Sequence, residues 1–435
     1  MFSNDRARRA LWSLAFAGVM PSGSLAAEHP DVARSVETSA TAELDHAPPS
    51  LTVAVRRAWL RSPAVQAADA KLAAADARAL AATRPLYNPE LEITAQNADV
   101  NTRSIGVSQT IDWSGKRRAR SGAAAAEMRA GQAEREQVRQ RVALQWLSGF
   151  SAYRAACEQV ALGARRVTLL AQFAALAQRR LAAGDIPPLE GDLAELALQE
   201  AHAEQAGLLA DQAKARQSLS AVGDDDAKSL PELPQALPPA AAIPLAAASV
   251  EALPALRQAA AEVEAADARI VVAERDRRAD PTISLTGGRV TDGPIDDKVV
   301  GINLRIPLFL RNDYSAEVTA ARAGADEAAA TLHDRHRQAV AEAEQAGTSY
   351  NALREAWQRW QHSRASNADE RATLLQRLWE AGELSTSDYL VQLKQSNDTE
   401  LAASRLRARA WQAFADWLGA SGELDRWLGL DGIAQ

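Results

Sequence analysis

Residues 88–120 read NPELEITAQNADVNTRSIGVSQTIDWSGKRRAR, and here the hydrophobic period changes from that of a helix to that of a strand. Leu91 and Ile93 alternate with polar residues, and after a short break the run at 104–111 alternates again. Such alternation is typical of a strand with one apolar face. Two such runs joined by a short polar link predict a β-hairpin at 90–112, whereas the alanine-rich sequence on either side is typical of helix.

A second copy of this pattern occupies residues 280–310, which read DPTISLTGGRVTDGPIDDKVVGINLRIPLFL. It predicts a second hairpin at 281–309, and Asn88-Pro89 matches Asp280-Pro281. The repeat distance of roughly 190–200 residues is too long for a solenoid unit and indicates two homologous halves. Lone hairpins leave their edge hydrogen bonds unsatisfied and are unstable alone. We therefore expect the strands to close by joining strands from other chains.

Composition and charge restrict the possible function classes. A chain of 435 residues allows two or three domains. The formal net charge is −7, and because phosphate binding needs a basic footprint, nucleic acid is not expected as a partner. Cys157 is the only cysteine, so neither an intrachain disulfide nor a cysteine-based metal cluster is possible.

The start of the chain predicts an export signal. Arg6, Arg8 and Arg9 precede an apolar run at 10–20, and small residues at 24–27 offer a cleavage site. The alternative is a short amphipathic helix. No later segment is expected to reach the ~20 apolar residues of a membrane-spanning helix.

The rest of the chain is punctuated by proline and glycine. Long helices are expected at about 116–183 and, uninterrupted, at about 312–381, and the first of them would make a rod of roughly 100 Å. Trp357, Trp360, Trp411, Phe414 and Trp417 then fit the core of helix seams. The expected organisation is a signal peptide (1–27), an irregular segment (28–50), a first repeat (51–222), a Pro-rich linker (223–244), a second repeat (245–422) and a C-terminal tail (423–435), with tip turns between helices at 184–188 and 382–386.

With these features the chain resembles the TolC-like outer-membrane efflux factors over about residues 51–422. The motifs Asn88-Pro89-Glu90-Leu91, Ser108-Gln109-Thr110-Ile111 and Gly115-Lys116-Arg117-Arg118 resemble the branch that serves heavy-metal exporters of the cobalt–zinc–cadmium type. The resemblance implies a mainly α fold with a small β part. Long antiparallel helices would form a trimeric periplasmic α-barrel, and each chain would give four strands to a 12-stranded outer-membrane β-barrel.

The resemblance also implies a function and a set of partners. The chain would be a homotrimer and a passive duct in a tripartite efflux system, carrying solutes such as divalent heavy-metal cations. It would meet a periplasmic adaptor (membrane fusion protein), an inner-membrane RND-type pump and outer-membrane lipid. Neither a catalytic set nor a phosphate-binding loop is recognisable, so we expect no enzyme activity and no cofactor. The alternative is a soluble periplasmic coiled-coil scaffold or adaptor.

The two helix turns are the sharpest candidates for functional sites. Gly382–Leu390 resembles the family's turn at the periplasmic tip, which implies adaptor contact there and at the first-half counterpart. The residues concerned are Gly184, Asp185, Ile186, Pro187, Gly382, Glu383, Leu384 and Ser385. The resemblance further implies that Asp388, with Glu190, rings the pore aperture, where carboxylates attract cations and crowd one another. The alternative is that these acids only favour the helix dipole.

Two further groups of charged residues invite interpretation. Lys116, Arg117, Arg118 and Arg120 follow a strand, which suggests contact with lipid headgroups at the periplasmic rim of a barrel. The alternative is a solvated charged face. His333 and His336 lie three apart, but without a third ligand no metal site is predicted.

Overall fold

The computed structural model describes residues 46–223, 230–234, 236–363 and 368–430. The predicted signal peptide lies outside these ranges, as do most of the irregular segment and the last five residues of the tail. Contacts divide the chain into Met1–Glu43 and Leu44–Gln435, and the helices and strands of the described ranges belong to the second unit.

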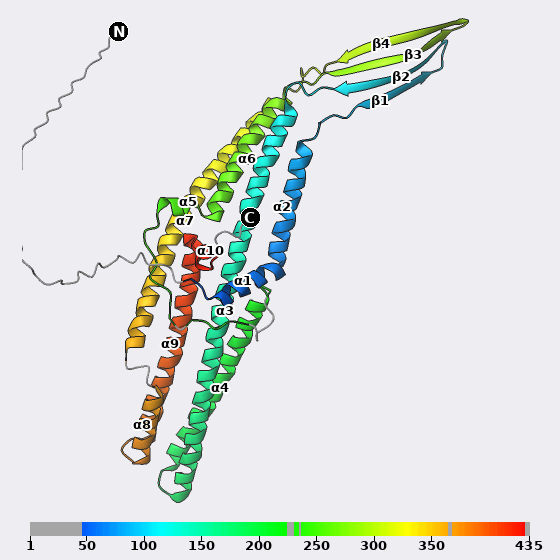
Figure 1. Cartoon of the computed structure of the whole chain (residues 1–435). Coiled ribbons are helices and arrows are strands. Elements are labelled where there is room, and N and C mark those ends of the chain that lie inside the picture. Colours follow the sequence, from blue (N-terminus) through cyan, green and yellow to red (C-terminus); the bar gives the residue numbers. More distant parts are fainter. Residues whose placement is uncertain (1–45, 224–229, 235, 364–367, 431–435) are drawn as a thin grey trace, which may run out of the picture. The chain divides into compact units, whose positions relative to one another are not determined.

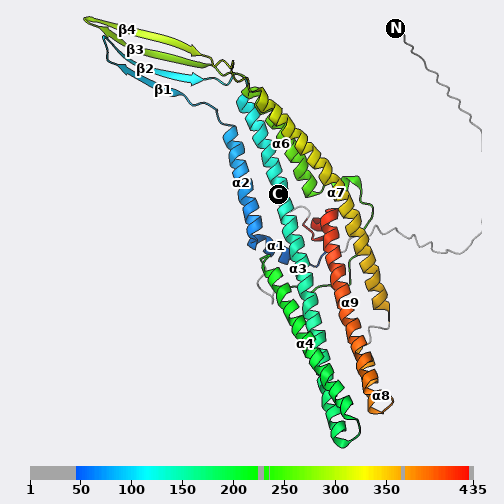
Figure 2. The ribbon, with the colours of Figure 1, turned by 180° about the vertical axis from the view of Figure 1, so that it is seen from behind.

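Helices make up most of this unit (Figures 1 and 2). In chain order they are α1 (Pro49–Arg61), α2 (Pro63–Ala82), α3 (Lys116–Ala183), α4 (Pro188–Ser220), α5 (Ala247–Glu251), α6 (Pro254–Asp276), α7 (Ser315–His362), α8 (Ala368–Glu380), α9 (Thr386–Ser421) and α10 (Leu424–Trp427). The strands are β1 (Glu90–Gln96), β2 (Val100–Thr110), β3 (Thr282–Asp292) and β4 (Ile295–Arg305). The predicted fold class, mainly α with a small β part, is confirmed.

The two hairpins join into one antiparallel sheet of order β1-β2-β3-β4. The central pairing connects the two halves of the chain, because β2 lies beside β3 with Val100 opposite Asp292 and Thr110 opposite Thr282. Strands β1 and β4 are the edges. The sheet follows α2 and α6 and precedes α3 and α7 in the chain, and the tip turns lie at the far end of the helical part, between α3 and α4 and between α8 and α9 (Figure 1).

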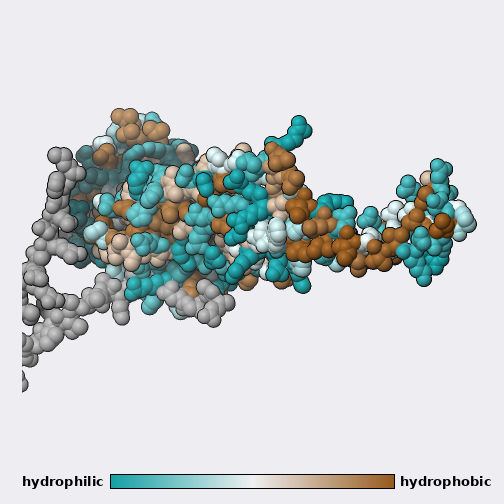
Figure 3. All heavy atoms as spheres, turned by 90° about the horizontal axis from the view of Figure 1, so that it is seen from above, coloured by the Kyte–Doolittle hydropathy of each residue, from teal (hydrophilic) through white to brown (hydrophobic). Residues whose placement is uncertain are grey.

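One face of the sheet is apolar and exposed. Directly paired residues share a face, so the register stacks Leu91, Val107, Leu285 and Ile302 in one row across four strands. Ile302 is 80% exposed, and the neighbouring row of Ile93, Ile105 and Val300 is exposed as well. Figure 3 shows a hydrophobic band along the sheet. The opposite face holds small and polar residues such as Ser104, Gly106 and Ser108.

The helices of the two repeats interlock. Helix α3 packs against α2 and α4 of its own repeat and against α6 and α9 of the other, and α7 packs against α6 and α9. A large aromatic core forms where these helices meet α1 and α10. Its largest side chains are Trp146, Phe150, Tyr350, Trp411, Phe414, Trp417 and Trp427. Trp357 is buried as predicted, whereas Trp360 stacks on it at 5.4 Å and is only half-buried.

The prediction of an uninterrupted helix at 312–381 was wrong. Helix α7 ends at His362, and α8 begins at Ala368. Ser363 has an extended backbone (φ −79°, ψ 153°), and both its N–H and its hydroxyl donate to the carbonyl of Trp360. Because serine can satisfy the end of a helix with its own side chain, it stops α7 without proline or glycine.

The expectation that no later segment resembles a membrane-spanning helix was also wrong for α3. It alone among the described helices contains a segment long and apolar enough to cross a membrane by length and composition, which we did not expect of any segment after residue 27. A third of that segment (33%) is buried within the chain, and the core helices of soluble proteins meet the same criterion.

The described part of the linker, 230–234 and 236–244, is fastened to the second repeat. The hydroxyl of Tyr350 donates to the carbonyl of Pro238 at 2.5 Å, and the Asn351 side chain makes hydrogen bonds of 2.8 and 3.0 Å with the backbone of Ala241. Arg407 donates to the carbonyl of Pro234. These contacts tie the linker to α7 and α9.

Close packing of β2 against β3 predicts different responses of two adjacent glycines. A Cβ at Gly288 would lie 2.4 Å from the carbonyl oxygen of Arg103 and 2.8 Å from Cα of Ser104, whereas one at Gly287 would meet nothing within 4 Å. Gly288→Ala should therefore cost about 1–3 kcal/mol through overpacking. Gly287→Ala is the matched control and should be nearly neutral. Thermal unfolding in detergent compares them, and equal midpoints would contradict this account of the sheet.

Candidate functional site: the helix tips and the sheet–helix junction

The first tip turn joins α3 to α4. Gly184 ends α3 in the left-handed region (φ 81°), and the N–H of Asp185 donates to the carbonyl of Arg180 at 2.9 Å. Glycine suits this position because it has no Cβ to clash. Pro187 and Pro188 then start α4, where a missing N–H costs nothing. Gly184, Asp185 and Pro187 are exposed, and Ile186 is half-buried.

The second tip turn joins α8 to α9 and repeats this geometry. Gly382 is again left-handed (φ 77°), and Ser385 is the N-cap of α9. The N–H of Asp388 donates to Oγ of Ser385 at 3.1 Å, and that hydroxyl donates to the Asp388 carboxylate at 2.7 Å. This reciprocal capping satisfies a free N–H at the helix start. Gly382, Glu383, Ser385 and Asp388 are exposed; Leu384 is half-buried.

An aromatic cluster holds the two helix pairs together above the tips. The ring of Phe173 in α3 lies 4.7 Å from that of Trp379 in α8 and 4.4 Å from that of Tyr389 in α9. The guanidinium of Arg180 lies over the Trp379 ring at 4.8 Å, a cation–π contact. Burial raises the pKa of Tyr389, with a smaller contribution from Glu380.

A chain of hydrogen bonds links the two tip turns directly. The indole N–H of Trp379 donates to Oγ1 of Thr386 at 2.9 Å, and the Thr386 hydroxyl donates to the carboxylate of Glu190. Thr386 is 1% exposed, so these bonds are shielded from water. Glu190 therefore fastens α4 to α9, whereas Asp388 remains exposed. The two carboxylates predicted at the aperture thus differ within the chain: Glu190 is bound to Thr386, and Asp388 faces solvent.

Two polar ties lie farther from the tip. The ammonium of Lys394 in α9 binds the carboxylate of Glu200 in α4, and this hydrogen bond lowers the pKa of Glu200 and raises that of Lys394. Arg166 of α3, only 4% exposed, is ion-paired with Glu204 of α4 and lies 3.7 Å from Asp398 of α9.

Sequence reasoning missed several of these residues. Arg180, Trp379 and Thr386 were not singled out, because their roles depend on contacts between repeats. One signal was available: Trp379 and Thr386 flank the Gly382 turn, where an aromatic and a hydroxyl side chain can meet across the turn.

A buried ion pair connects the sheet to the helices. The ammonium of Lys116 lies 3.0 Å from the carboxylate of Asp280, and the two side chains are 9% and 3% exposed. Tyr87 donates to the same carboxylate at 2.8 Å, and Ser114 donates to it at 3.3 Å. Burial and this hydrogen bond raise the pKa of Tyr87 to about 12. Residues from both repeats thus meet around one carboxylate.

Lys116 is buried, although the sequence pattern that places it beside three arginines suggests an exposed cation. Its ammonium is ion-paired with Asp280, and contact with lipid headgroups stays a prediction for the exposed arginines. Arg117 and Arg118 are exposed, and Arg120 is ion-paired with Asp276 at 3.2 Å. Asp112 accepts the N–H groups of residues 116 and 117 at 2.7 and 2.8 Å, which offsets the unfavourable position of cations at a helix start.

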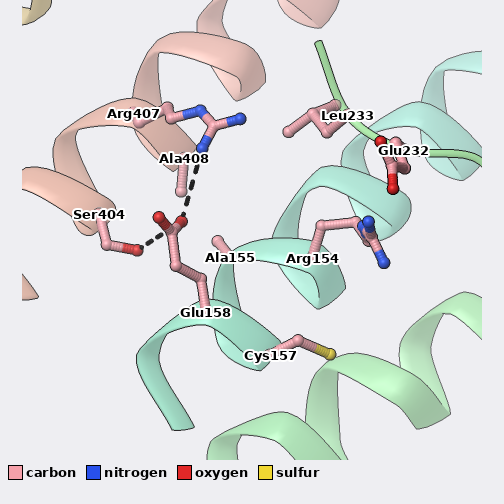
Figure 4. Close-up of a pocket in the computed structure, with 9 residues that line it drawn as sticks. All are labelled: Arg154, Ala155, Cys157, Glu158, Glu232, Leu233, Ser404, Arg407 and Ala408. Carbon is pink, nitrogen blue, oxygen red and sulfur yellow. Dashed lines mark hydrogen bonds and ion pairs between the residues drawn. The ribbon is translucent and has the colours of Figure 1, made fainter. Parts of the chain in front are cut away.

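A cavity of about 380 Å³ lies between α3, α9 and the linker (Figure 4). Glu158 points into it, accepts a hydrogen bond from Ser404 at 3.1 Å, and lies 3.7 Å from Arg407. The sulfur of Cys157 accepts a hydrogen bond from Gln212 at 3.2 Å. These groups hold the helices and linker together. Among the described residues, no group of three or more His, Cys, Asp and Glu side chains is arranged to hold a metal ion.

The burial of the Lys116–Asp280 pair predicts that a variant of Lys116 loses much more stability than a variant of Arg120. Lys116→Met leaves the Asp280 carboxylate buried without a cation and should cost about 3–5 kcal/mol. Arg120→Gln breaks the exposed pair with Asp276 and should cost about 0–1 kcal/mol. Denaturant midpoints compare the two variants. If Lys116→Met costs no more than Arg120→Gln, the junction does not depend on the pair.

Known proteins share this architecture. A membrane protein from Pseudomonas aeruginosa has a TM-score of 0.71 at 22% identity, covering 87% of this chain and 94% of that one. The CmeC outer membrane channel of Campylobacter jejuni has a TM-score of 0.70 at 15% identity, covering 86% and 85%. At these identities the likeness concerns the fold.

Sequence comparison gives a nearer relative. The cobalt-zinc-cadmium resistance protein CzcC of Cupriavidus metallidurans is 30% identical over 241 residues, 54% of this chain and 58% of the relative. The matched stretch therefore spans less than two thirds of that protein. The family described as outer membrane efflux protein matches residues 54–222 and 248–422, which include both tip turns and both hairpins. Because the match covers most of the chain, the protein belongs to the outer membrane efflux protein family.

Proposed function

We propose that the chain is the outer-membrane channel of a tripartite, RND-type efflux system. Three copies form a passive duct, with the sheets closed into a 12-stranded barrel in the outer membrane and the helices forming a tunnel in the periplasm. The duct uses no cofactor and catalyses no reaction. An inner-membrane pump supplies the work, and a periplasmic adaptor docks on the tips.

The exposed apolar face of the sheet is the observation that carries this proposal. Rows of aliphatic side chains are exposed on one face, and strands β1 and β4 have open edges. A water-soluble protein would leave both features as aggregation hazards. Closure by neighbouring copies would satisfy the edges, and lipid would cover the apolar face.

The tips support adaptor docking and a gate. Both turns present exposed residues at the end of the helices remote from the sheet, and three copies would bring three Asp388 carboxylates around one axis. Like charges crowded together constrict a pore and select cations. The ties from Glu190, Lys394 and Arg166 hold α9 against α3 and α4, so we propose that opening requires these ties to loosen.

Divalent heavy-metal cations are the proposed solute. The support is the 30% identity to a protein named for cobalt, zinc and cadmium resistance. A wide duct contacts its solute weakly, so selection would lie with the pump.

One substitution distinguishes the proposed membrane barrel from the alternative, a soluble periplasmic scaffold. Ile302→Lys introduces a cation on the apolar face and should cost about 2–4 kcal/mol per chain if that face meets lipid. Since Ile302 is 80% exposed in the single chain, a soluble scaffold would tolerate the change. The control is Asn303→Lys on the opposite face. The measurement is the yield of heat-modifiable trimer in membranes; equal yields would reject the barrel.

The proposed gate predicts how two Asp388 variants behave. Asp388→Asn removes the charge but keeps an acceptor for Ser385, whereas Asp388→Ala removes both. If the carboxylate ring constricts the entrance, both variants should raise the conductance of reconstituted trimers and lower their cation selectivity. If only Asp388→Ala raises the conductance, the effect comes from the lost helix cap. If neither variant changes the conductance, the gate is rejected.

A further inference from the structure

Three cations lie side by side on the apolar face, near the turns of the hairpins. Arg103 is directly opposite Arg289, and Arg289 is directly opposite Lys298. Paired residues of an antiparallel sheet share a face, so the three side chains form one row, which we call the cationic row. It lies at the end of the sheet away from the helices, where Figure 3 shows hydrophilic residues beyond the hydrophobic band.

The cationic row marks where the apolar face ends along the strands. Leu304, Ile302, Val300 and Lys298 follow one another on that face of β4, two residues apart. At about 3.4 Å per residue the row lies roughly 20 Å from Leu304 along the strand. Strands of outer-membrane barrels are tilted by about 35–45°, so this distance spans about 15 Å of an apolar band that is about 25 Å tall. The exposed side chains of Ile306, Leu308 and Leu310 continue the apolar surface on the other side of Leu304. The row therefore lies at the end of the apolar surface, where lipid headgroups would begin.

The fold itself does not neutralise this row. Like charges directly opposite each other destabilise a sheet. Arg289 is ion-paired with Asp296 at 3.3 Å, and in the described part of the chain neither Arg103 nor Lys298 has an ion pair within 4 Å. By register, Asp292 and Asp297 belong to the opposite face. Among the strand residues on the apolar face near the turns, three cations thus stand against one acid, Asp296, and an external anion could offset the excess.

We propose that the cationic row binds the phosphate groups of anionic lipids in the outer leaflet of the membrane. The inference rests on the proposed function, which puts the helices in the periplasm and this end of the sheet at the outer surface. Guanidinium groups bind phosphate with two parallel hydrogen bonds, and lysine adds a point charge. The aliphatic rows beneath would contact the acyl chains of the same lipid, which favours a lipid over a free anion or a protein.

The test measures which lipid stays on the protein. The full chain is reconstituted in vesicles of zwitterionic lipid mixed with a lipid bearing phosphate monoesters, or with the same lipid after its phosphates are removed. Inserted protein is then re-extracted, and its retained lipid is quantified. Wild-type protein should be enriched in the phosphorylated lipid alone. Each cation should contribute about fivefold, the equivalent of about 1 kcal/mol, so the variant R103Q/R289Q/K298Q should lose the enrichment.

A matched variant controls for loss of charge. R129Q/R337Q/R359Q removes three exposed arginines from α3 and α7 and should retain lipid like the wild type. Equal enrichment in the cationic-row variant overturns the inference and leaves the barrel intact, whereas failure of wild-type protein to insert overturns both. Equal retention of the dephosphorylated lipid, or full displacement by inorganic phosphate, overturns the assignment to a lipid phosphate.

Discussion

The constraint on which the rest of this structure depends is that strand backbones must find hydrogen-bond partners. Each chain supplies four strands, and the pairing of β2 with β3 leaves β1 and β4 as edges. Four twisted strands are too few to close on themselves. Strands from identical chains would pair with these edges and complete a ring. The same sheet therefore implies both an oligomer and a place in the membrane, because only a closed barrel of strands can span lipid. The open edges and the exposed aliphatic rows thus have one common explanation.

The two repeats are joined by different chemistry at their two ends. Near the sheet, the Asp280 carboxylate of the second repeat is buried with Lys116, Tyr87 and Ser114 of the first. Near the tips, the Lys394–Glu200 pair is about half exposed, whereas the Thr386–Glu190 hydrogen bond is shielded and involves no cation. Breaking a buried ion pair is costly, whereas exposed pairs contribute little. The ion pair at the junction is therefore harder to break than the Lys394–Glu200 pair near the tips.

Much of this fold follows from local sequence, and the remainder depends on contacts between distant segments. Alternation at Leu91, Ile93 and Val107 predicted strands, and glycine followed by proline at Gly184 predicted the first tip turn. The stop at Ser363 was missed because serine ends a helix only through its own hydrogen bonds. Lys116 was taken as exposed because nothing in its neighbourhood reveals a carboxylate 164 residues away. The links through Thr386 were invisible for the same reason. Local periodicity thus identifies helices and strands, whereas the partners of buried side chains are set by contacts between distant segments.

The pairing of the central strands has a consequence for biogenesis. Thr110 and Thr282 hydrogen-bond to each other although they lie 172 residues apart. At about 5–20 residues per second, translation needs on the order of ten to thirty seconds between these two positions. Contacts this distant in sequence also form slowly, because loop closure costs entropy before pairing repays it. Throughout that interval the edge of β2 that pairs with β3 has no partner, which leaves the first hairpin open to pairing with other strands.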